Sequence, residues 1–198
     1  MKIDRNITPF FDINDILAIL TKNLKNILKD QLIGVYLTGS LTYGDFDLGS
    51  SDIDFLVVLN SALSGELREK VKTLHDQIER QYPKWSKRIE CSYITEDMLQ
   101  CIDPPVKLRP YVNGGKMWNP DPPYGNEWLI NLYALYECGI ALIGPNPKLL
   151  IGHPVDVREV RNASKKDLHQ EWKLLLKNPE PLQDSHFQAY AILTLCRI

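Results

Sequence analysis

The sequence has few cysteines, and none of them is arranged as a disulfide framework or a zinc site requires. Only four cysteines occur among 198 residues, none belongs to a Cys-x-x-Cys pair, and the four histidines are scattered without helical pairing. We therefore expect mostly buried free thiols in a reducing compartment. The residues concerned are Cys91, Cys101, Cys138, Cys196, His75, His153, His169 and His186.

Long apolar runs and a basic charge balance are also missing. No run approaches the roughly 20 apolar residues that cross a bilayer, and the charged start Met1–Arg5 leads into an amphipathic stretch. The formal net charge is −2 at pH 7, and no stripe of Lys and Arg with interleaved aromatics is present. Because nucleic-acid binders depend on such basic residues, we expect no nucleic-acid partner. From the lack of long apolar runs and of a signal-peptide core we expect a cytoplasmic protein with no membrane partner.

The hydrophobic periodicity predicts an α/β (α+β) fold. Apolar residues recur at helical spacing over 13–28 and 67–78, and strand-like apolar stretches occupy 32–38, 53–59 and 88–94. The order of helix, strand, short helix, strand, helix and strand predicts a small mixed sheet with helices packed on it. Prolines, together with the turn at Asn113–Gly115, interrupt the middle of the chain before a helix at Glu127, and further helices are expected over 168–176 and 189–198.

The pair of aspartates at the start of the second strand is the strongest chemical signal. Asp52 and Asp54 are separated by one residue, so on a strand their side chains project to the same face. Two carboxylates this close repel each other unless a cation lies between them, and Mg²⁺ prefers such hard oxygen ligands. The alternative is ordinary, because aspartates at a strand entrance are often solvated or bonded to turn amides.

Two further features give the aspartate pair a context. Gly39 and Ser40 follow the first apolar strand, where glycine lets the chain turn tightly and lets an anion approach the backbone. Glu90 lies on the third strand and supplies a third carboxylate, which could serve as the base that takes a proton from a substrate hydroxyl. Gly39 could equally form a plain strand-to-helix turn, and Glu90 could face solvent on a half-exposed strand.

Together these residues resemble a known family. The Gly-Ser turn, the Ser-Asp-x-Asp entrance to a strand and the later glutamate look like the DNA polymerase β-type nucleotidyltransferase superfamily. Three downstream segments are similar to its aminoglycoside adenylyltransferase branch. The likeness is strong over 34–59 and looser elsewhere. The superfamily likeness lies in Gly39–Ser40, Ser51–Asp54 and Glu90. The three downstream segments are Asn126–Trp128, Leu142–Pro145 and Leu193–Arg197.

The resemblance implies a nucleotidyltransferase domain over 1–157 and a short C-terminal helical segment over 158–198. It implies Mg²⁺, with two ions expected, and ATP as co-substrate. Asp52 and Asp54 would hold the metal, with Glu90 as base and further metal ligand. Gly39 and the side chains of Ser40, Ser51 and Arg197 would contact the ATP phosphates. Trp128 would lie against the antibiotic ring.

Acidic and aromatic residues between 118 and 137 point to the acceptor. Glu127 and its acidic neighbours lie near tryptophans and a tyrosine, a combination that suits a polycationic sugar through ion pairing and stacking. The alternative is a proline-rich loop leading into a helix whose aromatics belong to the core. We expect Mg²⁺-dependent transfer of AMP from ATP to a hydroxyl of an aminoglycoside or aminocyclitol such as spectinomycin or streptomycin. Transfer to a protein or tRNA, or a nucleotide-binding remnant with little activity, is the alternative.

The last helix is expected to end without a recognisable stop signal. Residues 189–198 form an apolar run without a cap or a glycine, whereas adenylyltransferases of this branch continue through more helices. The helical domain therefore looks incomplete in comparison with the family. An exposed apolar face on this helix would favour a homo-oligomer.

Overall fold

The structure, a computed structural model, describes residues 7–85 and 87–197. Within these residues, six strands form one mixed sheet in the order β5-β4-β3-β2-β1-β6. β2 and β3 run parallel, and every other neighbouring pair is antiparallel. The strands are β1 Leu32–Thr38, β2 Ile53–Leu59, β3 Ile89–Thr95, β4 Tyr111–Asn113, β5 Lys116–Met117 and β6 Ile140–Ile143.

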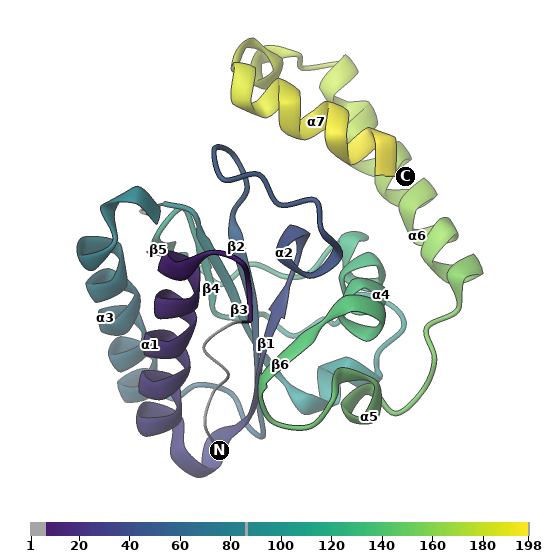
Figure 1. Cartoon of the computed structure of the whole chain (residues 1–198). Coiled ribbons are helices and arrows are strands. Elements are labelled where there is room, and N and C mark those ends of the chain that lie inside the picture. The colour runs from purple at the N-terminus through teal and green to yellow at the C-terminus, as the bar shows by residue number, and fades with distance from the viewer. Residues whose placement is uncertain (1–6, 86, 198) are drawn as a thin grey trace.

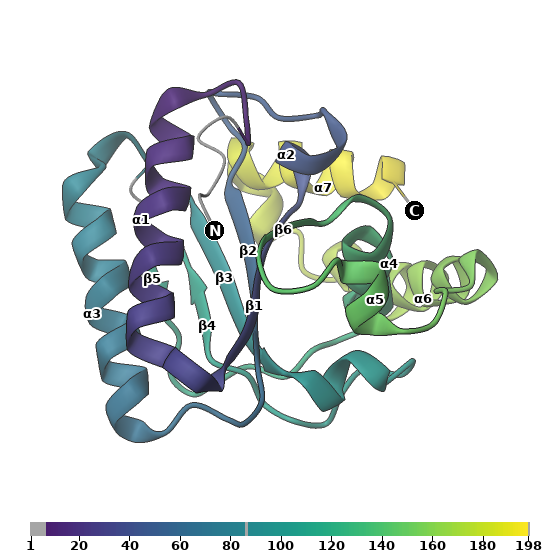
Figure 2. The ribbon, with the colours of Figure 1, turned by 60° about the horizontal axis from the view of Figure 1, so that its bottom comes forward.

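Helices lie on both sides of the sheet. Figures 1 and 2 show α1 and α3 side by side on one face, α4 and α5 on the other, and α6 and α7 as an arm beyond α4. The helices are α1 Phe11–Leu28, α2 Ser40–Tyr43, α3 Gly65–Gln81, α4 Glu127–Cys138, α5 Pro147–Ile151, α6 Val157–Gln170 and α7 Ser185–Arg197, with short 3₁₀ helices at Lys29–Gln31, Pro83–Trp85, Glu96–Gln100, Trp172–Leu176 and Glu180–Gln183.

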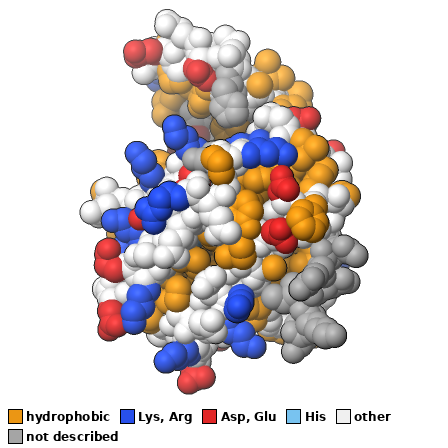
Figure 3. Space-filling model, turned by 60° about the vertical axis from the view of Figure 1, so that its left-hand side comes forward, with side chains coloured by type: hydrophobic (Ala, Val, Ile, Leu, Met, Phe, Trp, Pro, Cys, Tyr) orange, Lys and Arg blue, Asp and Glu red, His pale blue; other side chains and the backbone are white. Residues whose placement is uncertain are grey.

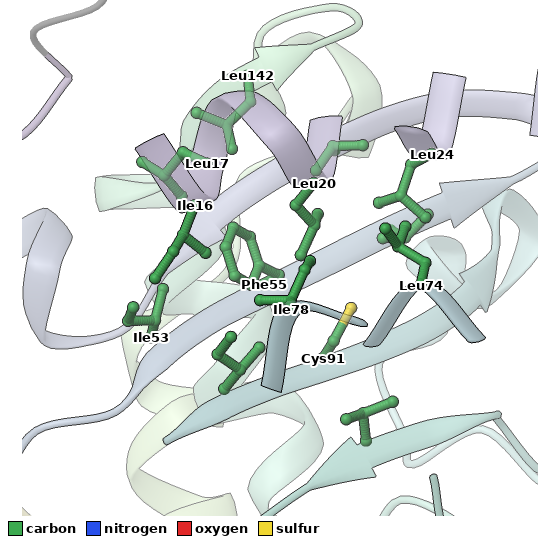
Figure 4. Close-up of a cluster of buried hydrophobic side chains, with 14 of the residues drawn as sticks. Ile16, Leu17, Leu20, Leu24, Ile53, Phe55, Leu74, Ile78, Cys91 and Leu142 are labelled. Carbon is green, nitrogen blue, oxygen red and sulfur yellow. The ribbon is translucent and has the colours of Figure 1, made fainter. Parts of the chain in front are cut away.

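The face under α1 and α3 holds a continuous apolar core. Alternate side chains of β2 and β3, among them Phe55 and Cys91, meet Leu20 of α1 and Ile78 of α3, and all four are at most 3% exposed (Figure 4). The amphipathic stripes of α1 and α3 are therefore satisfied against one sheet face. Outside this core, seen from the α1–α3 side in Figure 3, acidic and basic side chains are interspersed over the surface.

The other face is covered only in part. Tyr36 of β1, Val58 of β2 and Ile94 of β3 pack with Trp128 and Leu132 of α4 in a second apolar cluster. Because strand side chains alternate, Asp54 shares this face of β2 with Leu56 and Val58. Glu90 likewise shares it with Ser92 and Ile94 on β3, so the two carboxylates lie near the start of their strands. The polar end of this face therefore continues directly from an apolar, helix-covered end.

The structure confirms the predicted fold class and adds elements that periodicity did not reveal. The helices over 13–28 and 67–78 and the three strands lie where they were expected. Residues 111–117, of which only the turn Asn113–Gly115 was predicted, form the β4–β5 hairpin, whose two central glycines both have positive φ. The helix predicted over 168–176 is α6, which begins at Val157 and gives way to a 3₁₀ helix at Trp172.

Further expectations concern the final helix, membrane-spanning helices and the division into domains. The final helix, predicted over 189–198, begins earlier, at Ser185, and is described as far as Arg197. No helix within the described residues is long and apolar enough to cross a bilayer. The division into a domain of residues 1–157 and a helical segment of 158–198 stays a prediction, as does the cytoplasmic location.

Candidate active site

A row of polar side chains crosses three neighbouring strands at one end of the sheet. Thr38, the last residue of β1, pairs with Asp54 of β2 in the antiparallel register. Asp54 in turn pairs with Glu90 of β3 in the parallel register. Asp54 and Glu90 therefore lie side by side on the face that α1 and α3 do not cover. The sequence predicted that these two carboxylates share a site, and the sheet register brings them together.

The turn after β1 lies directly against this row. Gly39 has φ +67°, and a Cβ on it would lie 2.0 Å from Oδ2 of Asp54. Only glycine can therefore occupy this position without displacing the carboxylate. The hydroxyl and the N–H of Thr42 both donate to the carbonyl of Gly39, at 2.8 and 2.9 Å, and fix the turn that begins α2 at Ser40.

The loop between α2 and β2 is organised by Asp47. Its carboxylate accepts hydrogen bonds from the hydroxyl of Ser50 at 2.8 Å and the N–H of Gly49 at 2.9 Å, and these bonds lower the pKa of Asp47. Its own N–H donates to the hydroxyl of Ser51 at 3.0 Å. Ser51, predicted to contact phosphate, therefore lies in a loop that its neighbours hold in place.

Arg88 ties this loop to the start of β3. Its guanidinium donates to the carbonyls of Leu48, at 3.0 Å, and Ser51, and its Nε lies 3.9 Å from a carboxylate oxygen of Asp52. The same group lies over the ring of Trp85, 4.7 Å from the ring centroid. Sequence reasoning missed Arg88 as a site residue. The available signal was a basic residue at the entrance of the strand that carries Glu90.

Glu90 lies in a partly buried, polar environment. Burial raises its pKa, and the nearby charge of Asp52 raises it further. A hydrogen bond from the hydroxyl of Tyr111 and the charge of Arg109 act in the opposite direction. Removal from water is the largest of these effects, because it penalises the charged form of a carboxylate. A carboxylate with a raised pKa is a better proton acceptor than an exposed one.

The three carboxylates share one region without forming a closed coordination shell. No group of three or more His, Cys, Asp or Glu side chains is arranged to hold a metal ion anywhere in residues 7–85 and 87–197. The donor set nevertheless fits Mg²⁺, because Asp52, Asp54 and Glu90 offer only hard carboxylate oxygens. The like-charge effect of Asp52 on Glu90 is one that a divalent cation would relieve.

The two residues predicted to contact the acceptor lie in α4 and differ in exposure. Trp128 is only 2% exposed, its indole N–H donates to the carbonyl of Cys101 at 2.8 Å, and its ring packs on Tyr124. The structure thus places Trp128 in the core and not at a binding surface. Glu127 is partly exposed, and its carboxylate accepts a hydrogen bond from the N–H of Gly125 at 3.0 Å.

The C-terminal helices bring a second group of side chains toward this face. Burial raises the pKa of Tyr190 on α7, and the charge of Glu90 raises it further. The ring of Tyr190 lies 5.7 Å from that of Trp172, whose indole N–H donates to Asp167 at 2.8 Å. The side chain of Arg197, predicted to neutralise phosphate charge, lies outside the described residues.

Comparisons with known proteins find a family model and a solved structure that this chain resembles. Residues 21–103 match the family model described as "Nucleotidyltransferase domain". The structure is similar to the crystal structure of spectinomycin adenyltransferase AAD(9) from Enterococcus faecialis with ATP and spectinomycin, with a TM-score of 0.66 and 22% identity over 92% of this chain and 73% of that one.

A weaker likeness, with a TM-score of 0.39 and 13% identity over 80% of this chain and 94% of the other, is to a crystal structure of a toxin-antitoxin with AMP-PNP. Among curated proteins, none matches the chain.

Proposed function

We propose that this chain, whose residues 21–103 match a model described as a nucleotidyltransferase domain, transfers AMP from ATP to a hydroxyl of an aminoglycoside or aminocyclitol, with release of pyrophosphate. The observation that carries the proposal is the Asp54–Glu90 pair on adjacent parallel strands, next to the Gly39 turn. This arrangement supports the proposal because a cation site, a base and a phosphate-accessible backbone would then lie within one small region.

The nucleotide side of the proposal uses the aspartates and the two loops. Asp52 and Asp54, with Glu90 as a further ligand, would hold Mg²⁺, which supplies positive charge to the phosphate oxygens when it is bound. Gly39 and Ser40 would bind phosphate on one side, and Ser51 on the other. Arg88 keeps the second loop in place through its bonds to the carbonyls of Leu48 and Ser51. We assign Arg197 to the phosphates as well, on the family resemblance alone.

The acceptor side of the proposal uses Glu90 as the base. The oxygen of the acceptor hydroxyl attacks the α-phosphorus of ATP, its proton passes to a carboxylate oxygen of Glu90, and the bond to the β-phosphate oxygen breaks as pyrophosphate leaves. General-base help of this kind contributes about 10²- to 10⁴-fold in rate. The raised pKa of Glu90 supports this role, because a stronger base takes the proton more readily.

A cationic sugar suits the groups that surround the acceptor side. Burial raises the pKa of Asp167, and the charge of Glu127 raises it further. The indole N–H of Trp172 donates to Asp167, and the ring of Trp172 lies beside that of Tyr190. Carboxylates beside aromatic rings attract ammonium groups. The similar AAD(9) structure contains ATP and spectinomycin, which supports the same substrate class here. Because Trp128 is buried, Glu127 is the α4 side chain that we retain for this contact.

A Mg²⁺-dependent pyrophosphate-release assay with ATP tests the proposal. A panel of spectinomycin, streptomycin and other aminoglycosides serves as acceptors, and we expect release with a subset of them. Glu90→Gln should keep ATP binding, measured by calorimetry, and lower turnover about 10²-fold or more. Glu69→Gln, on the exposed side of α3, is the matched control and should behave as wild type.

Each other outcome of the assay assigns a different function. Transfer of labelled AMP to a protein or a tRNA, with no antibiotic as acceptor, would replace the proposed acceptor class. ATP binding without pyrophosphate release with any acceptor would identify a nucleotide-binding remnant. Full activity of Glu90→Gln would remove Glu90 from the base role.

A further inference from the structure

The β4–β5 hairpin carries two polar side chains to the carboxylate of Glu90. The hydroxyl of Tyr111 donates a hydrogen bond to Oε1 of Glu90. The side-chain amide of Asn113 donates to the hydroxyl oxygen of Tyr111 at 2.9 Å. Because that oxygen accepts from Asn113, the single proton of Tyr111 is directed to Glu90. The three groups thus form one ordered chain of hydrogen bonds, from Asn113 through Tyr111 to Glu90.

The hairpin register explains why these residues meet. Cys91 pairs with Val112 and Ser92 with Tyr111, so the next step of this antiparallel ladder brings Asn113 across from Glu90. Side chains alternate along β4, and the side chain of Val112 joins the core under α1 and α3. Tyr111 and Asn113 consequently project to the opposite face, which is the face of Glu90.

The ring of Tyr111 is held independently of its hydroxyl. The guanidinium of Arg109 lies 4.8 Å from the centroid of the Tyr111 ring, and the ring of Trp118 meets it edge-on at 5.7 Å. Arg109 is itself buried at 6% exposure and donates to the carbonyls of Pro122 and Pro123 at 3.1 and 2.6 Å. A phenylalanine at position 111 should therefore keep the ring in place and remove only the hydrogen bond.

We propose that Tyr111 and Asn113 act as a clamp that positions the carboxylate of Glu90 toward the acceptor hydroxyl. One carboxylate oxygen is engaged by Tyr111, so the other is the oxygen that faces the substrate. This inference rests on the proposed function, because it assigns a task to Glu90 in that reaction. Tyr111 and Asn113 are positioning residues, since neither has to touch the substrate. Their effect is one of geometry, and misplacing a reacting group by about 1 Å can cost about 10²-fold in rate.

The test is a double-mutant cycle on kcat and KM. We expect Tyr111→Phe to lower kcat about 10- to 100-fold while KM for ATP stays within about twofold. Asn113→Ala should lower kcat less, and in the Tyr111→Phe background it should have no further effect, because Asn113 acts through the Tyr111 hydroxyl. Tyr133→Phe in α4 is the matched control and should leave both constants unchanged. Additive losses in the cycle, or a Tyr111→Phe enzyme with wild-type kcat, would overturn the proposal.

A second measurement separates the clamp from the reaction it serves. We would determine crystal structures of the wild type and of Tyr111→Phe. In the wild type we expect the Glu90 carboxylate in the position described here, and in the variant we expect it in a different position. If the wild type releases no pyrophosphate with any acceptor but Glu90 moves in the variant, the clamp stands and the proposed function fails. If Glu90 keeps the same rotamer in both structures, the clamp fails whatever the activity.

Discussion

The two faces of the sheet are built from the same strands but differ in what covers them. On one face, Phe55 and Cys91 pack under α1 and α3 and are at most 3% exposed. On the other face, their sequence neighbours Asp54 and Glu90 are partly exposed and meet a turn, a loop and a hairpin in place of a helix. Adjacent residues of one strand therefore pack in the core on one side and, in the proposed reaction, serve chemistry on the other.

This difference shows how the fold tolerates three carboxylates in one region. Bringing like charges together destabilises a folded chain, and the apolar core under α1 and α3 offsets that cost from the opposite side of the same strands. The polar end of the second face also remains beside the apolar cluster of α4. Substitutions that keep shape but remove charge should therefore separate the two roles sharply.

The largest expected effect is on activity, at Asp54. Asp54→Asn keeps the size of the side chain but removes the negative charge that would hold Mg²⁺ in the proposed reaction, so pyrophosphate release should fall about 10²-fold or more. The midpoint of thermal unfolding should stay the same or rise, because one of three neighbouring negative charges is lost. Activity and thermal unfolding are measured on the same preparation. Asp30→Asn, at an exposed position, is the control. An Asp54→Asn enzyme with wild-type activity would contradict the assignment of activity to the second face.

The next effect is on stability, at the residue beside it. Phe55→Ala opens a cavity under α1 and α3, and the free energy of unfolding measured in urea should fall by about 3–5 kcal/mol. Activity per folded molecule should fall much less than in Asp54→Asn. If the alanine variant does not fold, Phe55→Leu, with an expected loss of about 1 kcal/mol, allows the same measurement. A Phe55 variant that is stable but inactive would show that the two faces are not separable in this way.

Much of this arrangement could be predicted from the sequence, because it follows local periodicity. Alternation along residues 53–59 and 88–94 identified the strands and assigned Asp54 and Glu90 to their polar sides. The helices α1 and α3 followed from apolar spacing. What alternation cannot supply is register, so the pairing of Asp54 with Glu90 became known only from the parallel ladder.

The residues that sequence reasoning missed depend on contacts between distant segments. Tyr111 and Asn113 both belong to β4, a strand of three residues that is too short for a periodic signal, and the turn that follows it was predicted without its strands. Arg88 acts through loop carbonyls that no pattern specifies. Trp128 could not be assigned to core or surface from its spacing, and the bond from its indole to Cys101 decides in favour of the core.

The smallest expected effect is a pH dependence of opposite sign on the two faces. His75 of α3 is 2% exposed and bonds to the hydroxyl of Tyr93 at 2.7 Å, and burial lowers its pKa from 6.5 to about 4. Between these values the unfolded chain binds more protons, so this contribution is complete above pH 6.5 and is lost as the pH falls toward 4. This dependence follows from the difference between the folded and the unfolded pKa of His75. Glu90, with a raised pKa, acts in the other direction, because the folded state then holds its proton more tightly than the unfolded chain.

Urea unfolding of the wild type, His75→Gln and Glu90→Gln at pH 4.5 to 7.5 separates these contributions. His75→Gln should flatten the decline in stability toward acid, because glutamine cannot take up the proton that the unfolded chain binds at His75. Glu90→Gln should steepen the same decline, because it removes a group that favours the folded state as the pH falls. Identical slopes in all three proteins would show that neither buried group is coupled to folding. In that case the contrast between the two faces would extend to packing and activity but not to protonation.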